Sequence, residues 1–143
     1  MSTDDMMEGF GRIMDAGEVA EMMGMDVQMI RKYAREQRIQ AYRLPGTRTF
    51  KFFRNEILQK ILENPVGRQG RQGTDIDLDA LGPIMDATEV AEMMGMDVQM
   101  IRKYARDGQI PAYRLPGTRT FKFFQNEVLD TIRNNPVSVE ENV

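Results

Sequence analysis

The sequence predicts a mainly helical α+β protein made of two tandem copies of one small unit. Residues 13–66 align with residues 84–137 at a constant offset of 71, with 43 identities in 54 positions and no insertion. Each copy contains apolar residues at helical spacing and the stretch AYRLPGTRTFKFF, found at residues 41–53 and again at 112–124. A Pro-Gly pair between aromatic, β-prone runs predicts a small β-hairpin within each copy.

The repeat also sets the expected domain boundaries. A weaker match continues upstream, where Thr3 and Phe10 align with Thr74 and Leu81. We therefore expect a first domain over residues 1–66, a second over residues 74–137 and a tail over residues 138–143. Between the domains, GRQGRQG at residues 67–73 has the glycine-rich, polar composition of a flexible linker.

Each unit is expected to open with two helices joined by a short turn. Asp15 and Glu18 have the spacing of a capping box, and Gly24 is placed to end the helix that they begin. Asp26 is then placed to cap a second helix. An interval of about three residues between two helices is the spacing of a helix-turn-helix.

The remainder of the unit predicts a hairpin wing and a closing helix. AYRL and TFKFF would form its two strands, with Thr47 and Arg48 at the tip. Asn55 is placed to cap a last helix, which Pro65 would end. The predicted architecture is therefore two tandem helix-turn-helix units, each followed by a wing and a third helix.

Composition limits the chemistry that the chain can perform. It has no cysteine and no histidine, so disulfides and thiolate or imidazole zinc ligands are excluded, and we expect neither a metal nor a cofactor. No apolar run approaches the about 18 residues of a membrane span. The acidic start MSTDDMMEGF is unlike a secretory signal, which favours a cytoplasmic protein.

The sequence gives no indication of an enzyme. It lacks a glycine-rich phosphate loop ending in Lys-Ser/Thr, and it has no cysteine or histidine to act as nucleophile or base. The carboxylate pairs Glu18–Glu21 and Glu89–Glu92 fall one turn apart on helix surfaces. Solvated charge explains such pairs better than acid–base catalysis does.

Basic residues are concentrated in two segments. The net charge of the chain is −3, yet residues 28–54 carry a net +7 and residues 99–125 a net +5. The distribution of charge, rather than its sum, decides whether a protein can hold a polyanion. A solvated helix face is the simpler interpretation of either segment alone, but the same residues recur at the same spacing.

The second helix of each unit carries side chains suited to DNA. At about 100° per residue, Gln28, Arg31, Lys32 and Arg35 fall opposite the apolar side of the helix. Arg and Lys can donate to guanine O6 and N7, and Gln can bridge adenine N6 and N7. Met29 lies at the border of this face, where it could touch a thymine methyl, although methionine more often fills a core.

The wing adds further cations, since an Arg inserted into a narrow minor groove is favoured by its negative potential. Arg48 and Arg119 are the expected wing anchors, and phosphate contacts are expected from Arg43, Lys51, Arg114 and Lys122. The candidate DNA-binding residues are Gln28, Met29, Arg31, Lys32, Arg35, Arg43, Thr47, Arg48 and Lys51, with Gln99, Met100, Arg102, Lys103, Arg106, Arg114, Thr118, Arg119 and Lys122.

Both units resemble a known family over essentially their whole length. MDATEVAEMMGMDVQMIRKYARDGQIPAYRLPGTRTFKFFQNEVL is similar to the excisionase-type winged helix-turn-helix domain of the MerR superfamily. The shared features are a Glu-Val-Ala start, a glycine before the second helix, an Arg-Lys pair within it, an Arg-x-Gly-x-Ile-Pro-Ala turn and a wing ending in aromatic residues. In the first copy, Gln37 and Gln40 replace the glycine and proline of the turn, which predicts a looser turn there.

The resemblance implies binding to double-stranded DNA, with the second helix in the major groove and the wing in the minor groove. Residues 26–35 and 97–106 are identical, so both units should prefer the same bases. Repeated half-sites about one helical turn apart, some 34 Å, lie within reach of the linker, in direct or inverted arrangement.

Several processes stay open. Transcriptional regulation is the first expectation, in a bacterial nucleoid or, for a phage protein, in the host cytoplasm. An excisionase-like recombination directionality factor is the alternative, as is another architectural factor such as a plasmid-segregation or phage DNA-packaging adaptor. These roles would add a recombinase, a polymerase or another DNA-processing protein as partner. A protein-interaction module with an acidic partner is the further alternative.

Overall fold

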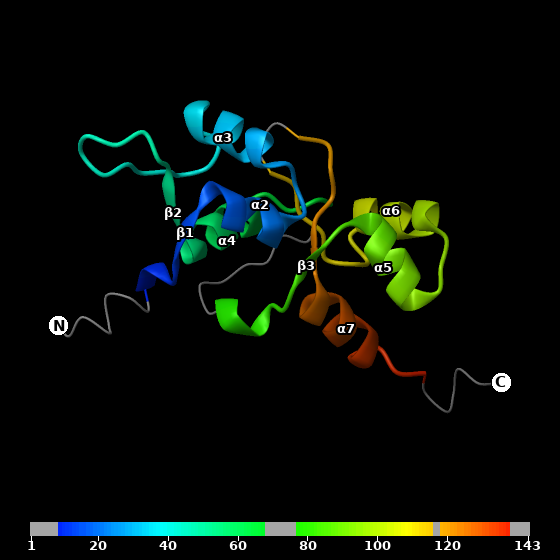
Figure 1. Ribbon diagram of the computed structural model, residues 1–143. Helices are drawn as coiled ribbons and strands as arrows, with labels where there is room; N and C mark the ends of the chain where they lie inside the picture. The colour runs from blue at the N-terminus through cyan, green and yellow to red at the C-terminus, as the bar shows by residue number, and fades with distance from the viewer. Residues whose placement is uncertain (1–8, 68–76, 116–117, 138–143) are drawn as a thin grey trace.

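The computed structural model describes residues 9–67, 77–115 and 118–137 (Figure 1). These residues are mainly helical, with two small antiparallel sheets of two strands each, which confirms the predicted α+β class. The predicted linker residues 68–73 and the tail 138–143 lie outside the described ranges. Within those ranges, every helix is too short or too polar to cross a membrane.

From the first strand of each unit onward, the two units contain the same elements in the same order. The first unit consists of β1 (Ile13–Asp15), α2 (Ala16–Met23), α3 (Val27–Arg35), β2 (Lys51–Phe53) and α4 (Arg54–Leu62). The second consists of the 3₁₀ helix η1 (Leu78–Ala80), β3 (Ile84–Met85), α5 (Ala87–Met94), α6 (Val98–Arg106), β4 (Phe123–Phe124) and α7 (Gln125–Arg133). We call residues 41–53 the first arm and residues 112–124 the second arm.

The predicted caps of the first two helices are confirmed. The Asp15 carboxylate accepts a hydrogen bond from the Glu18 N–H at 2.7 Å, and the Glu18 carboxylate accepts one from the Asp15 N–H at 3.1 Å. Gly24 ends α2 in the left-handed conformation, with φ of 63°. Asp26 caps α3 by accepting from the Gln28 N–H at 2.7 Å. The second unit repeats all of these contacts.

The predicted hairpin within each arm is largely replaced by another pairing. Residues 51–53 form β2, which pairs with β1 in the register Met14 opposite Phe52. Only a single bridge joins the two sides of the first arm, at Tyr42 and Lys51. The reason is burial: Met14 and Phe52 are both core residues, and pairing β2 with β1 places them side by side beneath α2.

Two further predictions about turns and caps are corrected. Asn55 does not cap α4, because that helix begins one residue earlier, at Arg54, with Phe53 at the N-cap position. The Asn55 amide donates instead to the Gly9 carbonyl at 3.5 Å. The turn after α3 is not looser than its copy: Gln37 adopts a φ of 60°, close to the 77° of Gly108. Equivalent backbone hydrogen bonds close both turns.

The two units share their cores. Leu81, Tyr113, Leu115 and Phe124 of the second unit are buried together with the core of the first unit. In return, Val66 of the first unit is buried with the core of the second. Although residues 13–66 and 84–137 are repeats in sequence, they do not pack as separate bodies.

Main-chain hydrogen bonds fasten this junction. Residues 64–66 run antiparallel to the start of the second arm, with a bridge between Pro65 and Tyr113. The Val66 N–H donates to the Ala112 carbonyl at 2.8 Å, and the Arg114 N–H donates to the Asn64 carbonyl at 3.0 Å. The Asn64 side-chain amide also donates to the Arg114 carbonyl at 2.7 Å.

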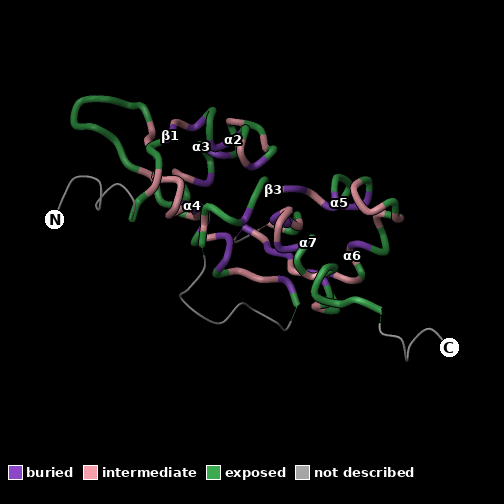
Figure 2. The backbone as a smooth tube through the Cα atoms, turned by 90° about the horizontal axis from the view of Figure 1, so that it is seen from below, coloured by how far each residue is buried: buried purple, intermediate pink, exposed green. Residues whose placement is uncertain are grey.

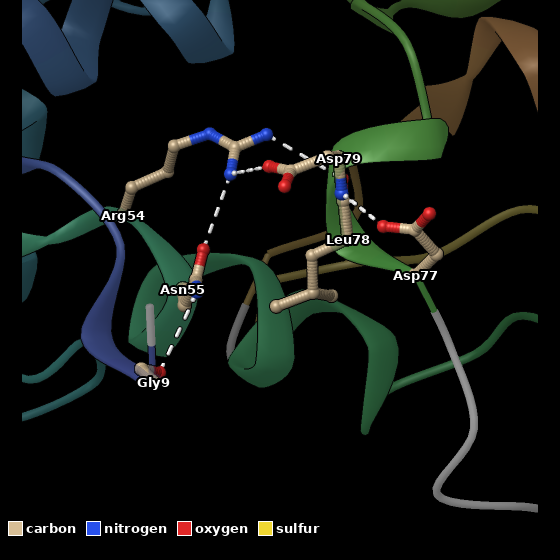
Figure 3. A network of polar contacts seen from close by, with 6 residues as sticks. All are labelled: Gly9, Arg54, Asn55, Asp77, Leu78 and Asp79. Atoms are coloured by element: carbon tan, nitrogen blue, oxygen red, sulfur yellow. Dashed lines mark hydrogen bonds and ion pairs between the residues drawn. The ribbon is translucent and has the colours of Figure 1, made fainter. Parts of the chain in front are cut away.

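A second polar contact joins the units at η1 (Figure 3). The Arg54 guanidinium forms an ion pair with Asp79, with 2.9 Å between Nη1 and Oδ1, and donates to the Leu78 carbonyl at 3.4 Å. Asp77 caps η1 by accepting from the Asp79 N–H at 3.1 Å. The relative placement of the units is therefore held at two sites, the pairing of residues 64–66 and the Arg54–Asp79 contact.

Candidate nucleic-acid interface

Helix α3 has one buried side and one exposed polar side. Ile30 and Tyr33 are buried, and they anchor the helix against α2. The opposite side exposes the side chains that the sequence analysis assigned to base reading, which are Gln28, Met29, Arg31, Lys32 and Arg35. The predicted orientation of this helix is therefore confirmed.

Helix α6 repeats this arrangement. Ile101 and Ala105 are buried. Gln99, Met100, Lys103 and Arg106 are exposed, and Arg102 is half-buried. The two helices thus carry the same donors on their outer sides, with Arg102 less exposed than its counterpart Arg31.

Arginines of the helix and of the arm line one cleft in each unit. In the first unit, a cleft of about 570 Å³ is lined by Arg31 and Arg35 of α3 and by Arg43 and Arg48 of the first arm. In the second, a cleft of about 460 Å³ is lined by Arg102, Arg106 and Arg119. Guanidinium groups donate bidentately to phosphate oxygens and to base edges, so each cleft is suited to an anionic ligand.

At the tip of each arm, the threonine hydroxyl is hydrogen-bonded within the arm's own turn. The Thr47 hydroxyl donates to the Leu44 carbonyl at 3.0 Å, and Thr118 makes the same bond to Leu115. Arg48 and Arg119 are exposed at the tips. The Arg43 guanidinium lies over the Phe50 ring, 4.8 Å from its centre, which holds this side chain along the cleft.

Two of the predicted phosphate contacts lie at the junction between the units. Lys122 is only 5% exposed, and its ammonium donates to the Met23 carbonyl at 2.8 Å, at the carboxyl end of α2. Burial lowers the pKa of Lys122, while the charges of Asp86 and Glu89 oppose that shift. Arg114 is half-buried over Phe121. In this arrangement the Lys122 ammonium is directed at the first unit and not at a ligand in solvent.

The role of residues 64–66 at the junction could not be predicted from local sequence. Pro65 was predicted only to end the last helix of the first unit, and Asn64 and Val66 had no predicted role. One feature of the sequence could have indicated a role for these three residues. Asn-Pro-Val is repeated at residues 135–137, although most of the preceding residues, 59–63, differ between the copies.

No protein-family model, curated protein or solved structure matches the chain. The interpretation of the two clefts therefore depends on their residues and geometry.

Proposed function

We propose that this chain is a sequence-specific double-stranded DNA-binding protein that acts in transcriptional regulation. In this proposal each unit is a winged helix-turn-helix, with α3 and α6 as the reading helices and the arms as wings. The observation that carries it is the convergence of helix and arm arginines on one cleft, which occurs in both units.

The donors on each helix are matched to base edges. In this proposal Arg31 and Arg102 contact guanine, and Gln28 and Gln99 contact adenine, where a good bidentate pair contributes about 1–3 kcal/mol of discrimination. Arg48 and Arg119 at the arm tips would contact the backbone or minor groove, which adds affinity that depends little on sequence.

The junction bears on the arrangement of half-sites. Because residues 64–66 are paired with the second arm, the two reading helices are held at one relative position. We therefore expect two copies of one short motif at a single spacing near one helical turn. The two units contribute different surfaces to the junction, so no two-fold axis relates them. This arrangement favours half-sites in direct repeat over half-sites in inverted repeat.

Selection of bound sequences from random duplexes tests the proposal. The intact chain should enrich one motif twice, and its affinity should fall as salt rises. The double variant Arg31→Ala/Arg102→Ala should relax the preference at one position in each half-site. The control Arg38→Ala/Lys60→Ala also removes two positive charges, but outside both clefts, and should leave the motif unchanged.

Two outcomes would count against this function. An unchanged motif in the Arg31→Ala/Arg102→Ala variant would show that the reading helices are assigned wrongly. Equal binding to every duplex, or to none, would favour a module that binds an acidic protein instead.

A further inference from the structure

Two segments of identical sequence occupy opposite environments. In the second arm, Tyr113 and Leu115 are each 2% exposed, whereas their copies in the first arm, Tyr42 and Leu44, are 40% and 62% exposed. The second arm lies between the units, while the first arm projects away from the rest of the molecule (Figures 1 and 2). The first arm therefore carries an apolar surface that the second arm uses for docking.

The surface that receives the second arm belongs to the first unit. It consists of the α4 side chains buried with Leu115, the main chain of residues 64–66 and the Met23 carbonyl. Leu58 and Ile61 of α4 are 3% and 0% exposed there.

The copy of this receiving surface on the second unit is open. Leu129 and Ile132 of α7, which correspond to Leu58 and Ile61, are 38% and 47% exposed. Val137 is 65% exposed, whereas its counterpart Val66 is 7% exposed. One end of the molecule thus has an arm without a receiving surface, and the other has a receiving surface without an arm.

We propose that copies of this chain associate head to tail through these two surfaces. The first arm of one copy binds α7 and residues 135–137 of the next and reproduces the internal junction. The equivalent contacts place Pro136 against Tyr42, and the Val137 N–H against the Ala41 carbonyl. The Lys51 ammonium then donates to the Met94 carbonyl.

Such an assembly is open-ended. Each added copy contributes a new free receiving surface. A contact between two different surfaces forms a growing chain of copies, unless the rotation between successive copies closes the chain into a ring. The free edge of the first arm supplies unpaired main-chain groups for this contact, since the Arg43 N–H has no backbone partner among the described residues. The inference needs no DNA and does not depend on the proposed function.

One substitution between the units makes the outer junction weaker than the inner one. Leu62, which is buried in the same cluster as Leu115 and Tyr113, is replaced by the exposed Arg133 on α7. A charged side chain within an apolar contact opposes docking, because it must lose water on binding. We therefore expect reversible association that strengthens at high protein concentration.

Sedimentation velocity of the full chain without DNA, from about 10 μM to 1 mM, tests the proposal. The mean mass should rise with concentration. Arg133→Leu restores the inner chemistry and should produce the same rise at about tenfold lower concentration, with a larger limiting mass. Leu44→Asp on the arm and Ile132→Asp on the receiving surface should each stay monomeric, since both side chains are exposed in the monomer and their loss leaves its core intact.

Mixing separates this arrangement from a symmetric dimer. Leu44→Asp keeps its receiving surface and Ile132→Asp keeps its arm, so an equimolar mixture should form a one-to-one pair that grows no further. The control Asn134→Asp adds the same charge two residues after Ile132, at a position where the first unit has the exposed Glu63, and should associate like the unaltered chain. The proposal would be overturned if the unaltered chain and Arg133→Leu both stayed monomeric at every concentration. It would also be overturned if Leu44→Asp and Ile132→Asp still associated.

Discussion

At the scale of single residues, the repeat provides matched pairs that differ only in their surroundings. Leu115 is enclosed by the core of the first unit, whereas Leu44 extends into solvent from the first arm. Their side chains and neighbours in sequence are identical, so any difference between substitutions at the two positions measures tertiary packing alone.

Leu115→Ala should lower the free energy of unfolding by about 2–4 kcal/mol, because it removes buried methyl groups and leaves a cavity. Leu44→Ala should change it by no more than about 0.5 kcal/mol, since an exposed side chain loses few contacts. Urea denaturation of the full chain, followed by circular dichroism, measures both. Equal effects at the two positions would mean that the second arm is not docked in solution.

Gln37 is the second residue whose surroundings matter. It holds the left-handed conformation that Gly108 adopts in the other copy. The left-handed conformation costs a residue with a side chain about 1–2 kcal/mol, a cost that glycine does not have. Glycine offsets part of this advantage, because it loses about 0.5–1 kcal/mol more chain entropy on folding.

Gln37→Gly should therefore raise the free energy of unfolding by about 0.5–1 kcal/mol. The reverse change, Gly108→Gln, should lower it by at least as much, because Gly108 also packs closely against Gly67. Thermal unfolding of both variants beside the unaltered chain gives the comparison. If neither substitution changed the free energy of unfolding, the left-handed conformation would carry no cost for a residue with a side chain in these turns.

At the scale of elements, the helices were predicted well and the strands were not. The caps Asp15, Gly24 and Asp26 could be identified because capping depends on residues a few positions apart in sequence. The partner of β2 could not, since the hairpin within the arm and the pairing with β1 are both compatible with the local pattern. What decides is the burial of Phe52 against Met14, a contact between residues far apart in the chain.

The capping box of α2 gives a prediction for a whole helix. Asp15→Ala removes the acceptor of the Glu18 N–H and should lower the free energy of unfolding by about 1 kcal/mol. Asp15→Asn retains an acceptor oxygen and should retain most of that stability. Chemical denaturation of the two variants distinguishes them, and an equal loss in both would point to the charge of Asp15 instead of its hydrogen bond.

For the whole molecule, the sequence predicted two units and missed how they join. No rule that acts on local sequence can assign burial to one copy of AYRLPGTRTFKFF and exposure to the other. The difference arises because the second arm docks on the first unit, through contacts between residues far apart in the chain. The same docking buries Lys122 at the junction, whereas its copy Lys51 is only half-buried, although both were assigned to phosphate.

Amide hydrogen exchange of the full chain tests the docked arrangement directly. The N–H groups of Val66 and Arg114 donate across the junction, so they should exchange slowly, close to the rate of the core helices. The Arg43 N–H, at the position equivalent to Arg114, should exchange rapidly at concentrations where the chain is monomeric. Asn64→Ala removes the side-chain bond to the Arg114 carbonyl and should speed exchange at Val66 and Arg114 while leaving α2 and α5 protected. Rapid exchange at both junction amides in the unaltered chain would instead describe two independent units on a flexible tether, and the two reading helices would then have no fixed spacing.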